Sequence, residues 1–368
     1  MKKWFMRILG SIALLAVVLV GGFYLGGGMT LVARIIAPSF PDFPQAQTQL
    51  VAGQQGKLYY PTQTPFDLDV LLAKGDRAEP TTGVGTLFMP EGASEDAPVP
   101  AMILLHGSGG ISPGREMEYG QMLADNGYAA FVVDYYAPRG ASTEINYMRR
   151  VLSVTEFDAI ADSYGALKLL RTHPEIDASK IGVGGYSYGG MAARLGMDDR
   201  IRQALIGDAP GFAAHVDYYG PCFQNLKSDK ITGGPLLTLR GTEDASNDLA
   251  ACVEREQEIE AVGNVVEAHV YEGAGHAWEV QVPRQLSPKS PYVAGCEVQY
   301  DDIGHSSMGG TPIVDFPLET PRIERIAARM QSGSVMNPCV HYGYIIGQDD
   351  ETKAKTDAVL LTFLDTYL

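Results

Sequence analysis

The residue with the clearest chemical potential in this sequence is Ser187, which lies in the stretch GYSYG at positions 185–189. Residues 180–185 are mostly apolar and predict a buried strand, whereas residues 191–195 can begin a helix. A serine at such a sharp strand-to-helix turn has a strained backbone, and glycines on either side avoid collisions with the neighbouring elements. The context predicts a nucleophilic serine, although a glycine-rich chain also produces this pattern by chance.

A serine hydroxyl becomes a good nucleophile only when a histidine accepts its proton and a carboxylate holds that histidine in the right tautomer. Asp244 follows a predicted buried strand at 235–241, and His276 lies in a glycine-containing loop after a shorter strand at 267–271. Serine, acid and histidine thus occur in the order that a serine at this kind of turn requires. We predict that Ser187, Asp244 and His276 form a catalytic triad.

Other residues compete for these roles. Glu243 and Asp248 are close to the predicted acid, and His269 alternates with apolar neighbours in a strand, which is typical of a structural histidine. Ser306 lies in GHSSM at 304–308, which lacks the second glycine and a strong strand before it. Because Ser306 also follows the acid and the histidine, the required order fails and Ser187 is favoured.

Acyl transfer also needs backbone N–H groups that stabilise an oxyanion. The amide of Tyr188, directly after the serine, is one expected donor. A predicted strand at 101–105 leads into the glycine-rich stretch HGSGG at 106–110, where Ser108 is the expected second donor and Gly109 the next choice. A merely flexible turn is the alternative for this loop.

On these motifs the chain resembles the dienelactone hydrolase family of α/β-hydrolases, over roughly residues 82–276 and the final helix. The resemblance rests on HGSGG at 106–110, VDYYAPRG at 133–140, GYSYG at 185–189, RGTED at 240–244 and GH at 275–276. It implies an α/β-hydrolase fold and hydrolysis of carboxylic esters. The namesake enzymes carry cysteine where this chain has Ser187, so dienelactone itself is not implied as the substrate. Asp134 and Arg139 are expected to be structural.

Strand and helix patterns alternate from residue 100 onward, which predicts a mainly parallel central sheet with helices on both faces. The expected helices lie near 119–126, 155–170, 188–196, 248–262 and 352–367. The net charge of -16 excludes nucleic acid as a partner, because phosphate binding needs clustered cations. No cysteine or histidine spacing suits zinc, so neither a metal nor a cofactor is expected.

The amino terminus predicts a membrane anchor. Three basic residues precede an uncharged apolar run at 8–25, which as a helix would be about 27 Å long and match a bilayer core. A cleaved signal peptide is the alternative, but no Ala-x-Ala-like site appears before Arg34. We predict a single-pass signal anchor within 1–36, in the cytoplasmic membrane, with the catalytic domain on the outer (periplasmic or extracellular) side.

Outside the cytoplasm, cysteines tend to be oxidised in pairs. Cys222 follows a predicted strand at 213–219, and Cys252 lies early in the helix after the Asp244 loop. These positions converge at one edge of a parallel sheet, so we predict a bridge between them that clamps the acid loop. Cys296 and Cys339 would then form the second bridge; four free thiols are the alternative.

The rest of the chain divides into an extended, proline-containing spacer at 37–48 and a catalytic domain at 49–368. An insertion at 281–348, directly after the predicted base, is expected to form a lid or wall over the pocket, or a surface excursion held by a disulfide. Tyr186 and Trp278 are the candidate pocket-lining aromatics, with core packing as their alternative role.

The sequence therefore predicts a membrane-tethered serine esterase that acts on a small or medium carboxylic ester or lactone through an acyl-enzyme. A peptidase or an acyltransferase would use the same triad. A non-catalytic envelope binding protein is the alternative from a different functional class. The sequence makes no prediction of oligomeric state.

Overall fold

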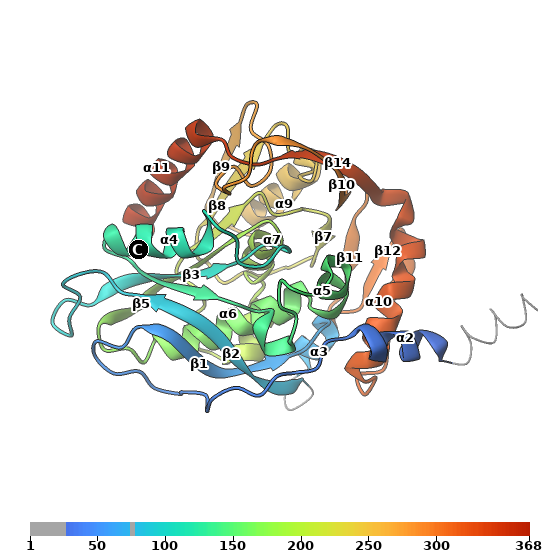
Figure 1. Cartoon of the computed structure of the whole chain (residues 1–368), viewed down its shortest axis with the longest axis horizontal. Coiled ribbons are helices and arrows are strands. Elements are labelled where there is room, and N and C mark those ends of the chain that lie inside the picture. The colour runs from blue at the N-terminus through green and yellow to red at the C-terminus, as the bar shows by residue number, and fades with distance from the viewer. Residues whose placement is uncertain (1–26, 74–77) are drawn as a thin grey trace, which may run out of the picture.

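The computed structural model of the protein describes residues 27–73 and 78–368. Its centre is an eight-stranded sheet with the order β1-β2-β4-β3-β5-β6-β8-β9 (Figure 1). β2 pairs antiparallel with β1 and β4, and every other neighbouring pair is parallel, so the predicted mainly parallel sheet is confirmed. The strands are β1 Gly56–Thr64, β2 Glu79–Phe88, β3 Val99–Leu105, β4 Ala129–Val133, β5 Ile176–Tyr186, β6 His215–Tyr218, β8 Leu236–Gly241 and β9 Val266–Tyr271.

Helices cover both faces of this sheet, and β3 shows why. Along this strand Ile103 and Leu105 belong to one buried apolar cluster, whereas Met102 and Leu104 belong to another. Successive side chains of a strand point to opposite faces, so a continuous apolar run requires cover on both sides. Helices α6 (Glu156–Leu170) and α7 (Tyr188–Leu195) contribute to the first cluster, and α4 (Glu116–Asp125) and α11 (Asp350–Tyr367) to the second.

The five expected helices correspond to α4, α6, α7, α9 (Leu249–Ala261) and α11. Each observed end lies within three residues of the expected one. The start of α6 is fixed by a capping box, in which Thr155 and Asp158 each bond the other's backbone N–H. The short helices α3 (Leu68–Leu72), α5 (Tyr147–Ser153) and α8 (Asp199–Ile206) were not predicted, because tertiary packing rather than a long periodic pattern forms them.

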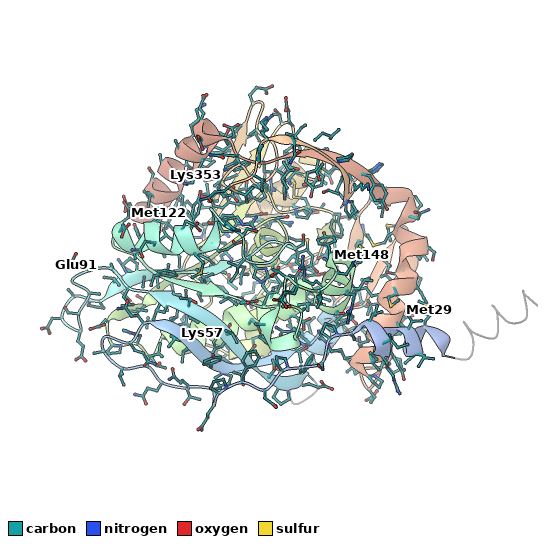
Figure 2. The ribbon with its side chains drawn as sticks, viewed as in Figure 1. Met29, Lys57, Glu91, Met122, Met148 and Lys353 are labelled. Atoms are coloured by element: carbon teal, nitrogen blue, oxygen red, sulfur yellow. A yellow bond between two sulfur atoms is a disulfide. The ribbon has the colours of Figure 1, made fainter. Side chains whose placement is uncertain are left out.

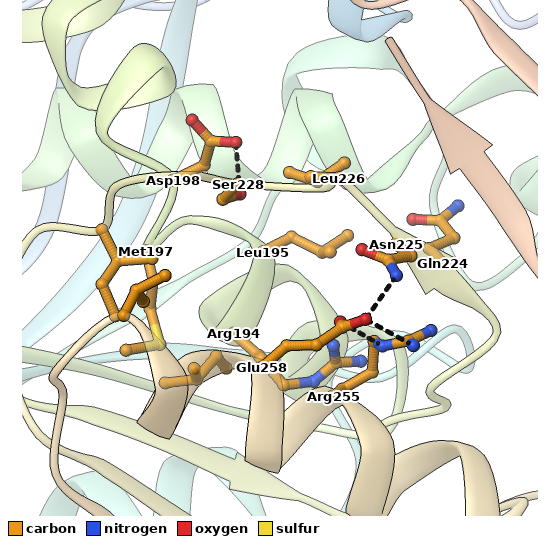
Figure 3. A pocket seen from close by; sticks show the side chains of 13 residues that line it. Arg194, Leu195, Met197, Asp198, Gln224, Asn225, Leu226, Ser228, Arg255 and Glu258 are labelled. Atoms are coloured by element: carbon orange, nitrogen blue, oxygen red, sulfur yellow. Dashed lines mark hydrogen bonds and ion pairs between the residues drawn. The ribbon is translucent and has the colours of Figure 1, made fainter. Parts of the chain in front are cut away.

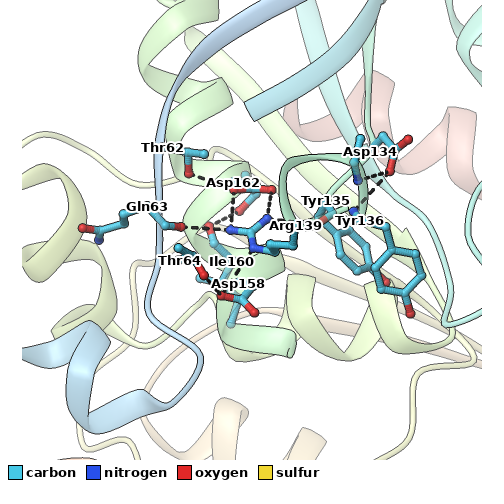
Figure 4. A network of polar contacts seen from close by, with 12 residues as sticks. Thr62, Gln63, Thr64, Asp134, Tyr135, Tyr136, Arg139, Asp158, Ile160 and Asp162 are labelled. Atoms are coloured by element: carbon cyan, nitrogen blue, oxygen red, sulfur yellow. Dashed lines mark hydrogen bonds and ion pairs between the residues drawn. The ribbon is translucent and has the colours of Figure 1, made fainter. Parts of the chain in front are cut away.

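A buried charge network joins the end of β1 to α6 (Figure 4). The guanidinium of Arg139 donates to both carboxylate oxygens of Asp162, at 2.6 and 3.0 Å, and to the carbonyl of Gln63. Burial would raise the pKa of Asp158, but the guanidinium groups of Arg322 and Arg139 hold this pKa well below its usual range. Arg139 therefore has the expected structural role.

The insertion folds onto the main domain rather than standing apart from it. β10 (Gln285–Val293) pairs antiparallel with β14 (Val340–Ile346). β11 (Val298–Tyr300), β12 (Ser306–Met308) and β13 (Thr311–Val314) form a small sheet, to which β7 (Gln224–Asn225) of the main domain adds a parallel strand. Helix α10 (Arg322–Met336) lies along the outer side of this region (Figure 1).

The chain upstream of the sheet packs against α10. In α2 (Gly28–Ile36), Ala33 is fully buried against Ile326 and Ala327, and Met29 lies beside them (Figure 2). Residues 37–48 contain no helix or strand. The apolar run predicted to anchor the chain, 8–25, lies outside the described residues. Within 27–73 and 78–368, no helix has the length and apolar character needed to span a bilayer.

Both predicted disulfides are confirmed. Cys222 is bonded to Cys252, with Cα atoms 5.0 Å apart, and Cys296 is bonded to Cys339, with Cα atoms 5.7 Å apart. All four cysteines are therefore paired. The first bridge joins the segment after β6 to the start of α9, and the second joins the segment after β10 to the residue that precedes β14.

Candidate active site

Ser187 lies at the sharp turn between β5 and α7. Its φ of 55° and ψ of -116° are rare for a residue with a side chain, because the Cβ atom crowds the backbone. The neighbouring glycines are sterically required. A Cβ atom on Gly185 would collide with the backbone of Gly189, and one on Gly189 would collide with the carbonyl of Leu105. The turn thus lifts the Ser187 hydroxyl away from the sheet.

The structure brings Ser187, His276 and Asp244 into one hydrogen-bonded chain. The Oγ atom of Ser187 lies 3.0 Å from Nε2 of His276, and Nδ1 of the same ring lies 2.6 Å from Oδ2 of Asp244. Both the histidine and the aspartate are buried. With Nδ1–H donating to the carboxylate, Nε2 is left as an acceptor for the serine proton.

Two residues that the sequence analysis missed hold the acid. The hydroxyl of Ser246 donates to Oδ1 of Asp244 at 2.5 Å and lies 3.1 Å from Nδ1 of His276. The side-chain amide of Asn247 donates to Oδ2 of Asp244 at 2.9 Å and to the carbonyl of Tyr219 at 2.8 Å. The only sequence signal for their role was that they are polar and closely follow the predicted acid.

The insertion fixes the base. The backbone N–H of His276 donates to the carbonyl of Ile345 in β14 at 2.7 Å, and the N–H of Gly347 donates back to the carbonyl of His276 at 3.0 Å. The ring of Tyr344, also in β14, lies 5.2 Å from the imidazole. The position of the histidine therefore depends on a segment about seventy residues further along the chain.

The two expected oxyanion donors belong to the residue after the serine and to the loop after β3. Tyr188 is the first residue of α7, where a backbone N–H has no acceptor within the helix. Within 27–73 and 78–368, neither its amide nor that of Ser108 donates to another protein group. The Tyr136 hydroxyl bonds the carbonyl of Ser108 at 2.9 Å and holds that loop in place. Their role as oxyanion donors remains a prediction.

A cavity of about 480 Å³ opens at Ser187 and His276. Loop 107–115 forms one side of it, with Ser108 and Arg115, and the insertion forms the other side. Lys289 and Pro291 of β10 and Tyr344 of β14 contribute to that second side. Of the two roles expected for the insertion, the structure thus assigns it that of a wall.

The expected aromatic lining was wrong. Tyr186 and Trp278 do not line this cavity, because both are buried in the apolar core under α4 and α11. The indole N–H of Trp278 donates to the Thr356 hydroxyl of α11 at 3.1 Å. Tyr147 and Tyr344 are the aromatic residues that line the cavity instead. A strand side chain next to the nucleophile points to the opposite face of the sheet, which explains the error for Tyr186.

A buried charge cluster lies below the cavity. The guanidinium of Arg115 lies 2.7 Å from a carboxylate oxygen of Glu116 and 3.8 Å from one of Glu279. Burial raises the pKa of Glu279, and the charge of Arg115 opposes that rise. The hydroxyl of Tyr219, whose ring packs 4.5 Å from that of His276, donates to Glu279. Arg115 is thus the buried cation at the cavity.

Other cavities lie away from Ser187, among them one of about 380 Å³ at Thr64 and Arg322 and the two described next. One of about 50 Å³ has space for little more than water and is lined by paired charges such as Arg255 and Glu258 (Figure 3). The other, of about 300 Å³, lies under α10 and is lined in part by Ser306. Within 27–73 and 78–368, no group of three or more His, Cys, Asp or Glu side chains could hold a metal ion.

The strand order, the single antiparallel strand β2 and the serine turn after β5 define an α/β-hydrolase fold. Residues 85–298 match the Dienelactone hydrolase family, and the chain belongs to that family of hydrolases. A search of curated proteins found no match.

Solved structures with a similar fold include a dienelactone hydrolase-like promiscuous phosphotriesterase, P91, from metagenomic libraries. It is 14% identical, the match covers 85% of this chain and 99% of that chain, and the TM-score is 0.50. A thermophilic esterase from the Planctomycetes species Thermogutta terrifontis is 16% identical over 53% of this chain and 80% of that chain, with a TM-score of 0.41.

Proposed function

We propose that the protein is a serine esterase that hydrolyses small or medium carboxylic esters or lactones through an acyl-enzyme. The observation that carries this proposal is the hydrogen-bonded chain from Ser187 through His276 to Asp244, with the serine and the histidine both at the 480 Å³ cavity. Nucleophile, base and orienting carboxylate are the parts that acyl transfer requires.

In the first half-reaction, the Ser187 oxygen attacks the ester carbonyl carbon while Nε2 of His276 takes its proton. The amides of Tyr188 and Ser108 stabilise the oxyanion. The imidazolium, oriented by Asp244, then protonates the departing alkoxide, and the alcohol leaves. In the second half-reaction, His276 takes a proton from water, the hydroxide attacks the acyl carbon, and the proton returns to the serine as the carboxylic acid leaves.

The cavity suits a small organic molecule, since ligand sites in proteins typically enclose about 300–1,000 Å³. Its lining combines apolar side chains, such as Val280 and Ile346, with the cations Arg115 and Lys289. No Asp or Glu is among the described residues that line it. These charges favour neutral or acidic esters over esters that carry an ammonium group.

Labelling with a fluorophosphonate, followed by intact mass measurement, tests the nucleophile. We expect one adduct on the unmodified protein and none on the Ser187→Ala variant, with Ser306→Ala labelled normally. p-Nitrophenyl acetate, butyrate and octanoate would then rank acyl chain length. An unlabelled but folded protein, or equal labelling of Ser187→Ala, would refute the serine-esterase mechanism.

We further propose that the amino-terminal segment tethers the enzyme to the outer side of the cytoplasmic membrane. The uncharged run at 8–25, with three basic residues before it, and the two disulfides support this proposal. The full chain should sediment with membranes and be digested by protease added to spheroplasts. Placing arginines at Leu15 and Val18 should abolish the association, and retention by that variant would contradict the tether.

A further inference from the structure

The cavity of about 300 Å³ under α10 is separate from the one at Ser187. It lies between α5, α6, α10 and the small sheet of the insertion, and the two cavities share no lining residue. Most of its lining is apolar, and the main contributors are Met148, Leu152, Phe157, Val298, Phe316 and Met336. Its volume is at the lower end of the range for small-molecule sites.

One cation in this cavity has few protein partners among the described residues. Arg329 of α10 lines the cavity with 31% of its side chain accessible. Its Nη2 atom donates to the Tyr188 hydroxyl at 3.3 Å, and among the described residues this is its only hydrogen bond. A guanidinium carries five N–H donors. Most of the N–H donors of Arg329 therefore have no hydrogen-bond partner among the described residues. The mostly apolar lining around this guanidinium also includes the carboxylates of Asp67 and Glu156.

Arg325, one turn earlier on α10, provides the contrast. It lines the same cavity, but its guanidinium donates to Asp67, to both oxygens of Asp69 and to the carbonyls of Pro317 and Thr320. This arginine is fully engaged in holding the fold. The two neighbours differ in what they can still bind.

The nearest carboxylate does not fully occupy Arg329. Glu156 lies 3.8 Å away, too far for a hydrogen bond. Its oxygens instead accept from the Tyr188 hydroxyl and from the side-chain amide of Gln224. Glu156 thus has hydrogen-bond partners of its own, and the guanidinium can accept a second anionic group on its cavity side.

We propose that this cavity is a second binding site, for a monocarboxylate with an apolar chain of medium length. The carboxylate binds Arg329, a planar fork that suits two carboxylate oxygens, and the chain packs against Phe157, Val298 and Met336. The site does not depend on hydrolysis at Ser187. Tyr188 accepts a hydrogen bond from Arg329 and directly follows Ser187 in the chain. A carboxylate bound at Arg329 would therefore lie next to a residue that adjoins the nucleophile.

Octanoate is the probe, titrated by calorimetry into the full-length Ser187→Ala protein in lipid nanodiscs, with empty nanodiscs subtracted. We expect octanoate to bind more tightly than methyl octanoate, 1-octanol and octylammonium. Each methylene lost from octanoate to hexanoate should weaken binding about fourfold. Equal binding of the four head groups would overturn the proposed role of Arg329.

Variants locate the site. Arg329→Gln should weaken octanoate binding about tenfold or more, since a charge-assisted hydrogen bond is lost. Lys289→Gln is the matched control, because it removes a cation from the cavity at Ser187 and should leave binding unchanged. If Lys289→Gln weakened binding and Arg329→Gln did not, octanoate would occupy the Ser187 cavity and the proposal would fail.

A second variant guards against misfolding of Arg329→Gln. Gly333 also lines the cavity, and a Cβ atom there would meet no other atom within 4 Å. Gly333→Phe should therefore fold and fill part of the cavity, and it should weaken octanoate binding. Thermal melting would show that each variant is folded. Unchanged octanoate affinity in a folded Gly333→Phe protein would refute the site.

Discussion

Ser187 and Ser306 each line a cavity, and the surroundings of the two serines differ. Ser187 lies at a strained turn, 3.0 Å from an imidazole that an aspartate orients. Ser306 lies in strand β12 and is buried, and the neighbouring His305 points its ring toward Asp301 and Asp315 instead. A hydroxyl beside a cavity is common in proteins. The comparison teaches that the base and the turn, rather than the residue type, create a nucleophile.

The two regions also differ in how they are held together. Each has one disulfide: Cys222–Cys252 beside the acid loop, and Cys296–Cys339 across the insertion. The site at Ser187 is built on strand ends of the large sheet, whereas the second cavity lies between helices α5, α6 and α10 and the small sheet of the insertion. The site at Ser187 can therefore hold reacting groups in a fixed geometry, whereas the cavity under α10 is suited to binding.

The sharpest test of the comparison removes each hydroxyl. Ser187→Ala should lower kcat/KM for p-nitrophenyl acetate by about 10⁶-fold, or to the background rate, because no nucleophile remains. Ser306→Ala should stay within about twofold of the unmodified enzyme. Loss of activity in a folded Ser306→Ala protein would reverse the assignment of the two cavities.

The acid can be tested against its neighbour in the same loop. Asp244→Asn should lower kcat by about 10⁴-fold, because an amide at this position favours the wrong histidine tautomer. Glu243→Gln is the matched control, since Glu243 is exposed and pairs with Arg284 at the surface. Initial rates with a short aryl ester measure both. Similar losses in the two variants would argue against a specific role for Asp244.

The disulfides should differ in their effect on catalysis. Replacing either pair with serines should lower the free energy of unfolding by about 2–5 kcal/mol, as measured by urea denaturation. Only the variant that lacks Cys222–Cys252 should also have a lower kcat at temperatures at which it remains folded. Cys222 closely follows Tyr219, whose carbonyl holds Asn247 against Asp244. An equal loss of kcat in both variants would show that the first bridge has no special link to the acid loop.

The smallest expected effect concerns a histidine that lies in the core. Burial lowers the pKa of His215 to about 4, while its ring bonds the carbonyl of Ala193. The unfolded chain binds this proton near pH 6.5, so between pH 6.5 and 4 the unfolded state binds more protons and stability falls as pH falls. The loss is about 3 kcal/mol.

The difference between the unmodified protein and His215→Gln isolates this contribution. Burial raises the pKa of Asp67 to about 6, so protonation of Asp67 increases stability as the pH falls. This contribution is present in both proteins and therefore cancels when their stabilities are subtracted. Urea denaturation at pH 7 and pH 4 should show a steeper loss in the unmodified protein. Parallel losses in the two would mean that His215 does not titrate as its burial predicts.

The sequence predicted the large sheet well because its strands are continuous apolar runs such as 101–105. It predicted the disulfide partners because strand ends and helix starts of a parallel sheet share one edge. It failed for the cavity lining, since Tyr186 and Trp278 turned out to be core residues. Whether an aromatic side chain faces a cavity or the core depends on which side of the sheet it lies. The sequence around Tyr186 and Trp278 did not indicate that side.

The sequence by itself determined the nucleophile turn, the order of serine, acid and histidine, and the elements that carry them, because local sterics and hydrophobic periodicity are written in short stretches of chain. Only the tertiary structure decided what surrounds them. Ile345 fixes the backbone of His276, Asn247 holds Asp244, and Arg329 lies at a mostly apolar cavity with one hydrogen bond among the described residues. The contacts of His276 and Arg329 join residues that are distant in the chain, and the contact of Asn247 depends on the geometry of its loop, so short stretches of sequence do not specify them.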